Sequence, residues 1–370
     1  MRKKNKACIL LGTRPEIIKM SPLIRACEEI GLDYYILHTG QHYSYEMDKK
    51  ICEDLEIGMP KYNLKVGSQP YRKQVGMMIR EIMEVLAKDK PDIIFVQGDT
   101  NSVLAGALAG NKLRIDIGHH EAGLRSHDTT MLEETNRIIT DHIADFLFAP
   151  THSALNNLKE EGIEQKKVFY TGNTVVDAVK QNLQIANKKK DVMTNLGIEK
   201  DNYFLVTAHR AENVDNIEKL KGIFEGLNLI GQNLRKPIIC PIHPRTKKKI
   251  EEYNIEISDK INMIEPVGYL EFLQLQANSK LIITDSGGIQ EEACILRIPC
   301  VTIRENTERP ETIESGSNIL VGTDPDKIYQ GAKEMINKPK NWSNPFGDGK
   351  AAEKILEFWM KNEHTDNINN

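Results

Sequence analysis

The chain has 370 residues, of which 40% are hydrophobic and 28% charged, and its formal net charge is −4. This length predicts two domains, each large enough for its own core, and the lack of a basic excess argues against a nucleic-acid partner. No apolar run approaches the ~20 residues that a membrane helix needs. The basic start and the short apolar run Ala7–Leu11 are too brief for a signal peptide and predict a first strand instead.

The cysteines and histidines give no metal-binding or disulfide pattern. The six cysteines are scattered, lack Cys-x-x-Cys spacing and mostly fall within apolar strand or helix patterns: Cys8, Cys27, Cys52, Cys240, Cys294 and Cys300. They predict reduced core thiols in a cytoplasmic protein. His119, His120 and His142 lack a third partner at metal-ligand spacing, so no structural metal is expected.

In chain order, the first strand runs into Gly12-Thr13-Arg14-Pro15-Glu16 and a helix predicted to reach about Ile30. Glycine before the turn and proline in the first helical turn are typical of a sharp strand-to-helix connection. Arg14 and Lys19 lie near this helix N-terminus, where cations oppose the helix dipole. They are either solvated surface charges or residues that hold an anionic ligand between them.

Two further strands of the first half end in carboxylates. A buried strand at 91–96 leads into Gln97-Gly98-Asp99-Thr100, and a strand from Ile115 leads into Glu121-Ala122-Gly123. Open α/β sheets bind ligands at the carboxyl ends of their strands, so Asp99 and Glu121 are candidate site residues. Asp99 precedes a small-residue helix at 101–109, and its alternative role is that of an N-cap alone.

Glu133 has two structural explanations beside a catalytic one. Thr130-Met131-Leu132-Glu133 has the form of a capping box, in which Glu133 reaches back to the Thr130 amide. Glu133 also lies one helical turn before Arg137, with which it can pair on a surface. Strand Phe146–Ala149, a helix from about Thr151 and strand Val168–Thr171 complete the first half.

The second half repeats the alternation of strands and helices. The predicted strands are 203–207, 237–241 and 261–264, and the predicted helices are 216–230 and 268–278. The loops His209-Arg210 and Ile242-His243-Pro244 follow the first two strands, and an amphipathic helix at 351–360 ends the patterned chain. This alternation predicts two Rossmann-like domains that face each other across a central cleft.

The stretch from Thr284 to Glu292 is the clearest ligand-binding motif. It lies between the apolar strands Leu281–Ile283 and Cys300–Ile303, which predicts a βαβ unit with Gly287 and Gly288 at the helix N-terminus. Adjacent glycines allow a ligand to approach the backbone, and the helix N-terminus favours an anion. Ser286 adds a hydroxyl group and Glu292 can accept hydrogen bonds from a ribose diol. The alternative is a tight turn with an acidic first helical turn and no ligand.

Other nucleotide motifs are missing from the sequence. No Gly-x-Gly-x-x-Gly follows a strand and no Walker motif is present, so neither a nicotinamide cofactor nor an ATPase is indicated. Several carboxylates around a nucleotide diphosphate-sugar suit proton transfer at a sugar carbon or glycosyl transfer. The residues alone do not choose between these two reactions.

Taken together, these segments resemble the non-hydrolysing UDP-N-acetylglucosamine 2-epimerases. The matching segments span nearly the whole chain in order: Gly12–Glu16 with Lys19, Gly98–Thr100, Glu121–Arg125, Glu133-Glu134 with Asn136-Arg137, Thr171–Thr174, His209-Arg210 with Glu212-Asn213, Asp285–Glu292 and Thr307–Glu311. The resemblance implies a GT-B fold. Its N-terminal domain, 1–172, would carry the carboxylates, and its C-terminal domain, 173–348, would bind UDP. The helix within 349–370 would cross back to the first domain.

The resemblance also implies the reaction. Such an isomerase interconverts UDP-GlcNAc and UDP-ManNAc by eliminating UDP to a 2-acetamidoglucal intermediate and adding it back, usually as a cytoplasmic homodimer that serves polysaccharide biosynthesis, without NAD, another cofactor or an obligatory metal. By position, the implied catalytic residues are Asp99, Glu121, Glu133 and His209. The implied UDP-sugar-binding residues are Arg14, Lys19, Ser286, Gly287, Gly288, Glu292 and Arg309.

Bacterial family members bind a second UDP-GlcNAc as activator, for which Gln41, His42, Arg210 and His243 are the counterparts. Four positions depart from the family pattern: Leu132 replaces a proline, Asn101 and Ser102 replace threonines, and His120 replaces a valine. None removes an ionisable group, so activity is expected to survive. The competing hypotheses are a hydrolysing relative that releases UDP and ManNAc, a GT-B glycosyltransferase, and a catalytically silent nucleotide-sugar sensor.

Overall fold

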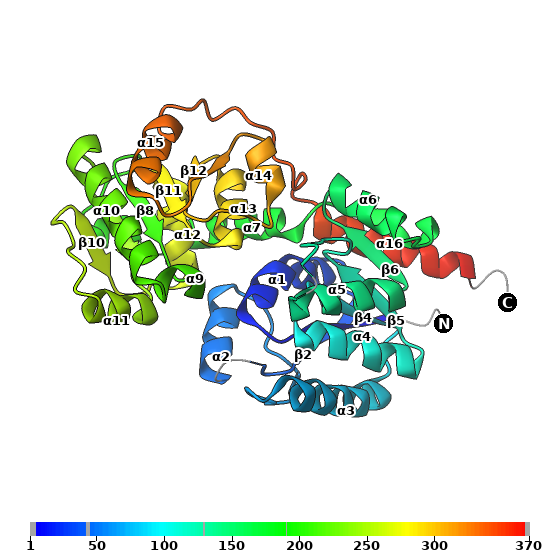
Figure 1. Ribbon diagram of the computed structural model, residues 1–370. Coiled ribbons are helices and arrows are strands. Elements are labelled where there is room, and N and C mark those ends of the chain that lie inside the picture. The colour runs from blue at the N-terminus through cyan, green and yellow to red at the C-terminus, as the bar shows by residue number, and fades with distance from the viewer. Residues whose placement is uncertain (1–4, 42–44, 129, 190, 367–370) are drawn as a thin grey trace. The chain divides into compact units, whose positions relative to one another are not determined.

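The computed structural model describes residues 5–41, 45–128, 130–189 and 191–366 (Figure 1). The chain divides into two compact units. Unit 1 comprises Met1–Gln181 and Phe346–Asn370, and unit 2 comprises Asn182–Pro345. The division falls within helix α7, Thr174–Lys188, so one helix carries the chain from the first unit into the second.

Unit 1 is built on a seven-stranded parallel sheet with the order β3-β2-β1-β4-β5-β6-β7. Its strands are β1 Lys6–Leu11, β2 Asp33–His38, β3 Tyr62–Asn63, β4 Ile93–Gln97, β5 Asp116–His120, β6 Phe146–Ala149 and β7 Val168–Tyr170. The order reverses at β1, where Ile9 pairs with Ile36 on one side and Phe95 on the other. The carboxyl ends of β1 and β4 therefore flank a topological switch point, the place where open α/β sheets bind ligands.

The helices of unit 1 cover this sheet (Figure 1). They are α1 Arg14–Glu29, α2 Tyr45–Asp54, α3 Tyr71–Asp89, α4 Asn101–Leu113, α5 Leu132–Ile143, α6 His152–Glu160, the start of α7, and α16 Ala351–Asp366, with a 3₁₀ turn at Gln165–Lys167. Helix α4 packs between α3 and α5. Its small residues allow a close approach to the sheet, since a Cβ at Gly106 would lie 2.3 Å from Leu10 Cδ2.

The last helix belongs to unit 1. The carboxylate of Asp177 accepts hydrogen bonds from the amides of Ala351 and Ala352, at 3.2 and 3.1 Å, and so caps the N-terminus of α16. Further along, the buried Trp359 ring packs edge-on against Phe95 of β4 with 5.6 Å between the ring centroids. These contacts fix α16 on the side of the sheet where it also meets α1.

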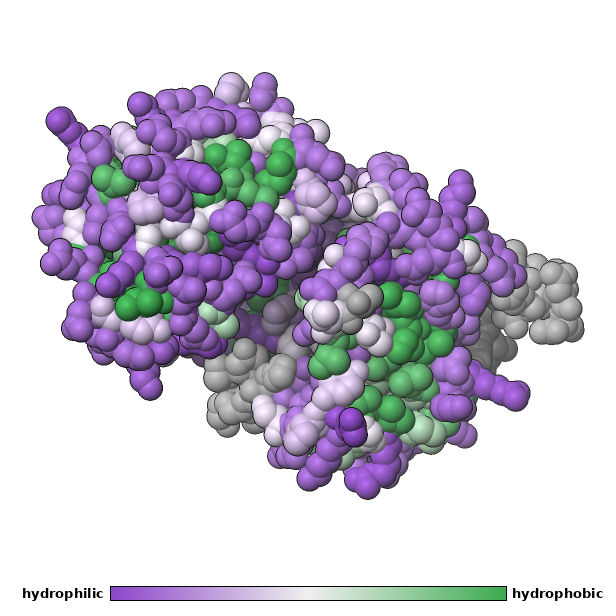
Figure 2. All heavy atoms as spheres, in the orientation of Figure 1, coloured by the Kyte–Doolittle hydropathy of each residue, from purple (hydrophilic) through white to green (hydrophobic). Residues whose placement is uncertain are grey.

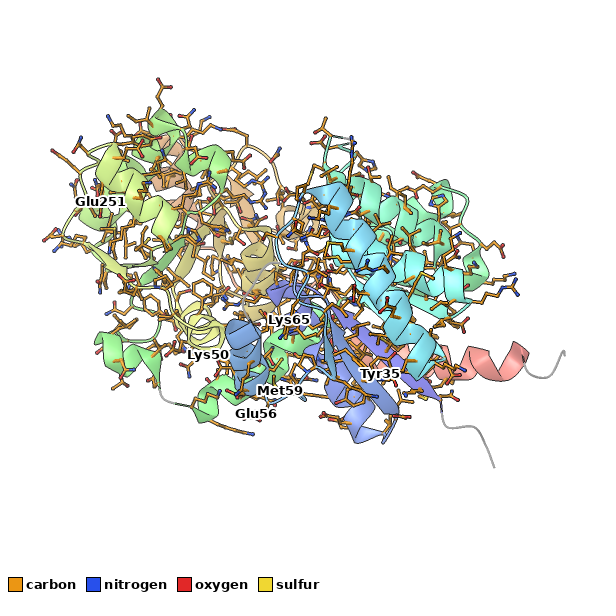
Figure 3. All side chains as sticks on the ribbon, turned by 90° about the horizontal axis from the view of Figure 1, so that it is seen from below. Tyr35, Lys50, Glu56, Met59, Lys65 and Glu251 are labelled. Atoms are coloured by element: carbon orange, nitrogen blue, oxygen red, sulfur yellow. The ribbon has the colours of Figure 1, made fainter. Side chains whose placement is uncertain are left out.

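The segment between α2 and α3 is irregular apart from the two-residue strand β3. Glu56 and Lys65 have left-handed backbones there, with φ of 54° and 51°, and Met59 is exposed (Figure 3).

Unit 2 has a six-stranded parallel sheet with the order β10-β9-β8-β11-β12-β13. Its strands are β8 Phe204–Thr207, β9 Ile238–Pro241, β10 Ile261–Ile264, β11 Leu281–Thr284, β12 Cys300–Thr302 and β13 Asn318–Leu320. Its helices after α7 are α8 Val192–Leu196, α9 Ala211–Val214, α10 Ile217–Leu234, α11 Pro244–Glu252, α12 Tyr269–Asn278, α13 Gly287–Leu296, α14 Pro310–Glu314 and α15 Pro325–Met335. The switch point of this sheet lies between β8 and β11.

Both sheets have the strand order of a Rossmann fold, which confirms the fold class predicted from the alternating pattern. The predicted βαβ unit is present as β11, α13 and β12, with Ile283 paired to Val301. All six cysteines are buried free thiols, as predicted. The elements that the sequence pattern did not predict include strands β3 and β13 and helices α8, α9, α11 and α15. Among the residues that the structure describes, no helix is long and apolar enough to cross a membrane.

Candidate active site

The turn after β1 in unit 1 is held by a buried carboxylate. Glu16 accepts hydrogen bonds from the amides of Gly12 and Thr13 at the start of α1 and from the hydroxyl group of Thr100, 2.6 Å away. Because Thr100 follows β4, Glu16 joins the turns on the two sides of the switch point. Burial raises the pKa of Glu16 to about 7, against the opposing effect of these hydrogen bonds. Arg14 lies partly buried in the same turn.

Glu121, directly after β5, is buried and surrounded by donors. Lys19 Nζ lies 2.6 Å from its Oε1, Asn173 Nδ2 donates to the same oxygen at 2.9 Å, and Gln97 Nε2 donates to Oε2. The backbone of Glu121 is left-handed, with φ of 66°, a strained conformation for a residue with a side chain and one typical of functional sites. Lys19 is therefore not a solvated surface charge: its partner within the chain is this carboxylate.

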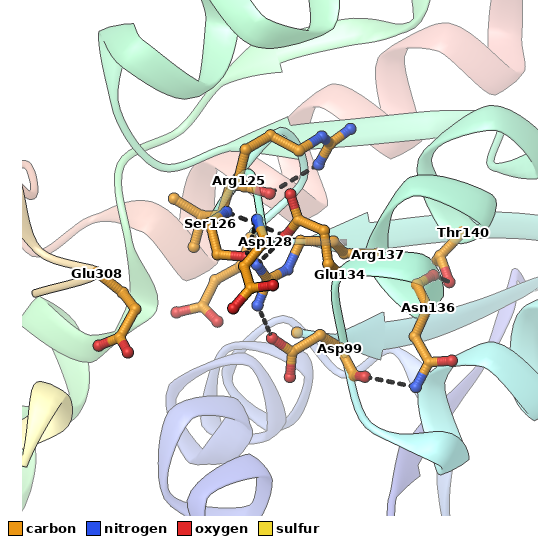
Figure 4. Close-up of polar contacts among 12 residues, drawn as sticks. Asp99, Arg125, Ser126, Asp128, Glu134, Asn136, Arg137, Thr140 and Glu308 are labelled. Carbon is orange, nitrogen blue, oxygen red and sulfur yellow. Dashed lines mark hydrogen bonds and ion pairs between the residues drawn. The ribbon is translucent and has the colours of Figure 1, made fainter. Parts of the chain in front are cut away.

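Asp99 lies in the turn after β4 and is bound by Arg137 of α5 (Figure 4). Arg137 also pairs with Glu134, and Asn136 donates a hydrogen bond to the backbone carbonyl of Asp99 at 2.9 Å. The N-cap of α4 is Thr100, so Asp99 is not the cap considered from the sequence. The structure thus brings the Asp99 turn close to Glu121, since a Cβ at Gly98 would lie 3.6 Å from Glu121 Oε2.

The predicted capping box at Glu133 is wrong. Helix α5 begins after Met131, and no side chain caps it. The hydroxyl group of Thr130 instead donates to Asp128 at 2.6 Å, and this local bond competes with the cap. Glu133 is exposed in the first turn of α5, and the surface pair with Arg137 is also wrong because Arg137 pairs with Glu134 and Asp99.

Glu134, next in sequence, has the structural role. It is buried and accepts hydrogen bonds from the amides of Ser126 and His127, at 3.0 and 2.9 Å, and from the Ser126 hydroxyl group (Figure 4). Burial by itself would raise the pKa of Glu134, but these bonds and the charge of Arg137 hold it below its usual value. Glu134 therefore fixes the loop between Glu121 and α5 and leaves Glu133 available at the surface.

His120, which departs from the family pattern, is a buried neutral residue. Its Nε2 accepts a hydrogen bond from the amide of Thr174 at the start of α7, at 3.4 Å. Burial lowers the pKa of His120 to about 4. The charge of Glu121 raises this pKa by a smaller amount, and the charge of Lys19 lowers it further. Asn173, which directly precedes Thr174 and α7, donates a hydrogen bond to Glu121.

In unit 2, the glycine motif forms the first turn of α13. Ser286 is the N-cap residue, and its side chain makes no cap hydrogen bond. Gly287 and Gly288 follow in the first helical turn, where amide groups have no partner within a helix. A Cβ at Gly287 would lie 3.6 Å from Glu308 Oε2 and 4.0 Å from Arg210 Nη2, whereas a Cβ at Gly288 would meet no atom within 4 Å. An anion can therefore approach the backbone at Gly288.

Asp285, the residue before this turn, binds the loop after β8. Its Oδ2 accepts hydrogen bonds from the amides of His209 and Arg210, each at 2.9 Å, and its Oδ1 lies 3.1 Å from His209 Nδ1. Burial alone would raise the pKa of Asp285, but the hydrogen bond and charge of His209 and these amides hold it below its usual value. The His209 ring is thereby oriented beside the glycine turn while its side chain stays 43% exposed.

The remaining cations near the turn have carboxylate partners. Arg210 lies 3.7 Å from Glu308, and Arg304 pairs with Glu308 at 2.9 Å. Burial by itself would raise the pKa of Glu308. The hydrogen bond and charge of Arg304, and more weakly the charge of Arg210, lower this pKa to about 2 instead. Arg309 Nε lies 2.8 Å from the buried Glu291 of α13, so the cation predicted to hold UDP is fixed to the glycine helix.

Glu292 of α13 contacts helix α12. Its carboxylate accepts hydrogen bonds from Gln276 Nε2 at 2.6 Å and from the Tyr269 hydroxyl group at 3.4 Å, both on α12. It lies one turn from the glycines on the partly buried side of α13.

Two of the four residues predicted for an activator are related to His209. The rings of His209 and His243 have centroids 6.3 Å apart, and Arg210 follows His209 in the chain. Burial, with the charges of His209 and Arg245, lowers the pKa of His243. Gln41 is in unit 1, where its Oε1 accepts hydrogen bonds from the Ser102 amide and hydroxyl group at 3.1 and 2.7 Å. His42 lies outside the described residues.

Six residues that hold the candidate site together were not predicted from the sequence: Glu16, Gln97, Arg137, Asn173, Asp285 and Glu308. All of them except Gln97 stand within the motifs named in the sequence analysis, so their proximity to the predicted residues was the available signal. Among the residues that the structure describes, no three or more His, Cys, Asp or Glu side chains group as metal ligands.

Comparison with known proteins identifies the family. A family profile described as UDP-N-acetylglucosamine 2-epimerase matches residues 25–360. The UDP-N-acetylglucosamine 2-epimerases of Methanocaldococcus jannaschii and Methanococcus maripaludis are 57% and 54% identical over 359 residues, which cover 95% of this chain and 98% of each relative.

A solved structure supports the same assignment. The crystal structure of the M. jannaschii UDP-GlcNAc 2-epimerase in complex with UDP-GlcNAc and UDP matches with a TM-score of 0.86 at 56% identity, over 96% of this chain and 99% of that chain. The GT-B architecture of two Rossmann-like domains implied by the motifs is thereby confirmed. The chain belongs to the UDP-N-acetylglucosamine 2-epimerase family of enzymes.

Proposed function

We propose that this chain interconverts UDP-GlcNAc and UDP-ManNAc by inverting C2, without a cofactor, through elimination of UDP and its re-addition. The observation that carries the proposal is the pair of carboxylates, Asp99 and Glu121, on neighbouring turns beside the switch point of unit 1. A module that only binds a nucleotide-sugar has no use for two carboxylates held by Arg137 and Lys19. An enzyme that moves a proton at a sugar carbon needs such groups.

We assign UDP binding to the C-terminal domain, 173–348. The diphosphate would lie on the first turn of α13, where Ser286, Gly287 and Gly288 offer backbone amides and a hydroxyl group. Arg309 and His209 would add positive or hydrogen-bonding groups to the leaving diphosphate, and Glu292 would accept hydrogen bonds from the ribose. Stabilising this leaving group is the largest electrostatic task of the reaction, because negative charge develops on the diphosphate as the bond to C1 breaks.

We assign the chemistry at C2 to the N-terminal domain, 1–172. A hydrogen on a carbon that bears an amide is not acidic, so its removal must accompany departure of UDP. In the forward direction a carboxylate takes the C2 proton, the C1–O bond breaks toward UDP, and the electron pair of the C–H bond forms the C1=C2 double bond of 2-acetamidoglucal. A second acid returns a proton to the opposite face of C2, and UDP adds back to C1. Asp99, Glu121 and Glu133 are the groups we propose for these proton transfers, with Arg14 and Lys19 holding the substrate.

We propose that the protein acts as a homodimer. Figure 2 shows apolar side chains gathered on unit 1 over the region where Figure 1 draws α4 and α5. Leu132 and Ile139 of α5 are 53% and 37% exposed. An apolar area on a surface helix is typical of a subunit contact. We also propose that Arg210 and His243, which lie near His209, take part in binding a second UDP-GlcNAc as activator, together with Gln41 and His42.

The test follows UDP-GlcNAc and the purified protein by proton NMR in deuterated water. Appearance of UDP-ManNAc with deuterium at C2 supports epimerisation by proton exchange. Release of free UDP and ManNAc assigns the chain to the hydrolysing reaction instead, and no change with added UDP-GlcNAc activator favours a transferase or a sensor. Glu121→Gln should abolish exchange, whereas Glu84→Gln, an exposed glutamate of α3, should not alter it.

A further inference from the structure

A buried imidazole–carboxylate pair lies beneath the two proposed catalytic turns. His119, the second-last residue of β5, and Asp141 of α5 are fully buried. His119 Nδ1 lies 2.7 Å from Asp141 Oδ1, and His119 Nε2 lies 2.8 Å from the backbone carbonyl oxygen of Gly98. Both ring nitrogens therefore contact oxygen atoms, so the ring joins the Asp141 carboxylate to the backbone carbonyl of Gly98.

Asp141 reaches the second turn as well. Its Oδ2 accepts a hydrogen bond from the amide of Gly123 at 3.0 Å and pairs with Arg125 at 2.7 Å. Arg125 is held in turn by Glu161. Gly123 itself allows no side chain, because its φ is 80° and an added Cβ would lie 2.3 Å from the carbonyl oxygen of Ala154.

The pair therefore joins the backbones of two separate turns. Gly98 directly precedes Asp99, and Gly123 comes two residues after Glu121. A chain of hydrogen bonds runs from the first turn through His119 and Asp141 to the second. A link of this kind sets the distance between two groups, because neither turn can move without breaking one of these hydrogen bonds.

We propose that His119 and Asp141 are positioning residues that set the separation of the Asp99 and Glu121 carboxylates for proton transfer on the two faces of C2. The inference rests on the proposed function and deepens it. Neither residue touches the substrate, because both are fully buried. A misplacement of about 1 Å in a catalytic group costs on the order of a hundredfold in rate. A faulty link should therefore lower kcat and leave UDP binding by the other unit unchanged.

The test compares His119→Gln with His142→Gln, the same substitution at an exposed histidine next to Asp141. Each variant converts UDP-GlcNAc in deuterated water, and NMR gives the ratio of deuterated UDP-GlcNAc returned to UDP-ManNAc formed. This ratio does not depend on the fraction of active enzyme. We expect His119→Gln to lower kcat on the order of a hundredfold, to change the ratio and to keep the wild-type affinity for UDP. His142→Gln should match the wild type.

A double variant tests the link itself. In His119→Gln with Asp141→Asn, the Asn amide can donate to the Gln oxygen while the Gln amide donates to the Gly98 carbonyl, so the chain of hydrogen bonds is restored without charge. We expect it to recover part of the lost kcat and the wild-type ratio. Should His119→Gln not fold, the same ratio is measured in Asp141→Asn. A wild-type ratio in each folded variant overturns the positioning role. A wild-type protein without any C2 exchange refutes the proposed function and the positioning role with it.

Discussion

Substitution of Gly288 by alanine separates binding at the α13 N-terminus from folding. Gly288 lies in the first turn of α13, its φ is outside the left-handed region, and an added Cβ meets no atom within 4 Å. Alanine there restricts the unfolded chain without strain in the folded one. This stabilises a protein by about 0.4–1 kcal/mol. For a unit of this size, the melting temperature should rise by about 1–4 °C.

The same methyl group should weaken UDP binding. In the proposed complex a phosphate oxygen lies against the backbone amides of this turn, where the new Cβ would stand. Losing one hydrogen bond to a charged group costs about 1.5–3 kcal/mol, which corresponds to a dissociation constant roughly ten- to a hundredfold higher. Calorimetric titration with UDP and a thermal melt without ligand measure the two effects, which have opposite signs.

Gly76 provides the matched control. It is exposed within α3 of unit 1, and an added Cβ there also meets no atom within 4 Å. Gly76→Ala should stabilise the protein in the same way and leave the affinity for UDP unchanged. If Gly288→Ala binds UDP as tightly as the wild type does, the diphosphate does not lie on this turn, and our assignment of the motif is refuted.

Three other predictions follow from single side chains. Glu133→Gln should lower kcat with an unchanged melting temperature, whereas Glu134→Ala should cost about 1–3 kcal/mol of stability by leaving buried amides unpaired; equal melting temperatures for the two would contradict these roles. Glu16 has a folded pKa of about 7, above its unfolded value, so its ionisation opposes folding. Wild-type stability should therefore fall relative to Glu16→Gln as pH rises from about 4.5 to 7, and parallel urea-denaturation profiles across that range would argue against it. Ile139→Glu should convert the dimer to a monomer in light scattering, and a dimer that persists would place the interface elsewhere.

The periodic elements were predictable because short apolar runs bounded by turn residues are typical of strands in a parallel sheet. Strands Phe146–Ala149 and Ile261–Ile264 have the predicted bounds. Strand β13, Asn318–Leu320, has three residues and a partly exposed end, so it gives no comparable signal. The predicted capping box at Thr130 was wrong because the Thr130 hydroxyl group donates a hydrogen bond to the nearby carboxylate of Asp128. Sequence spacing does not show which of two nearby groups a side chain will bind.

The candidate site was likewise predictable from the sequence only in part. Motifs marked the glycine turn and the carboxylates, since glycine pairs and acidic residues at strand ends have a direct chemical meaning. The partners did not follow from spacing: Arg137 reaches Asp99 across 38 residues, and Asn173 reaches Glu121 across 52. Such pairs exist only after the sheet has brought the strand ends together. Likewise, the left-handed backbone of Glu121 has no sequence signature in a residue other than glycine.

The two units stabilise their switch points by the same physical means. In unit 2, Asp285 follows β11 and accepts the amide hydrogens of His209 and Arg210, which follow β8. In unit 1, Glu16 accepts the amide hydrogens of Gly12 and Thr13 after β1 and the hydroxyl hydrogen of Thr100 after β4. Strand ends at a switch point diverge and leave amides that no neighbouring strand can satisfy.

A buried carboxylate that spans the gap satisfies these amides and holds both turns in place without a ligand. The cost is the burial of a charge, which is visible in the raised pKa of Glu16 and is offset at Asp285 by His209. The benefit is that groups such as His209 and Asp99 are placed before substrate arrives. Binding energy then need not be spent on ordering the turns and remains available for the unfavourable removal of a proton from C2.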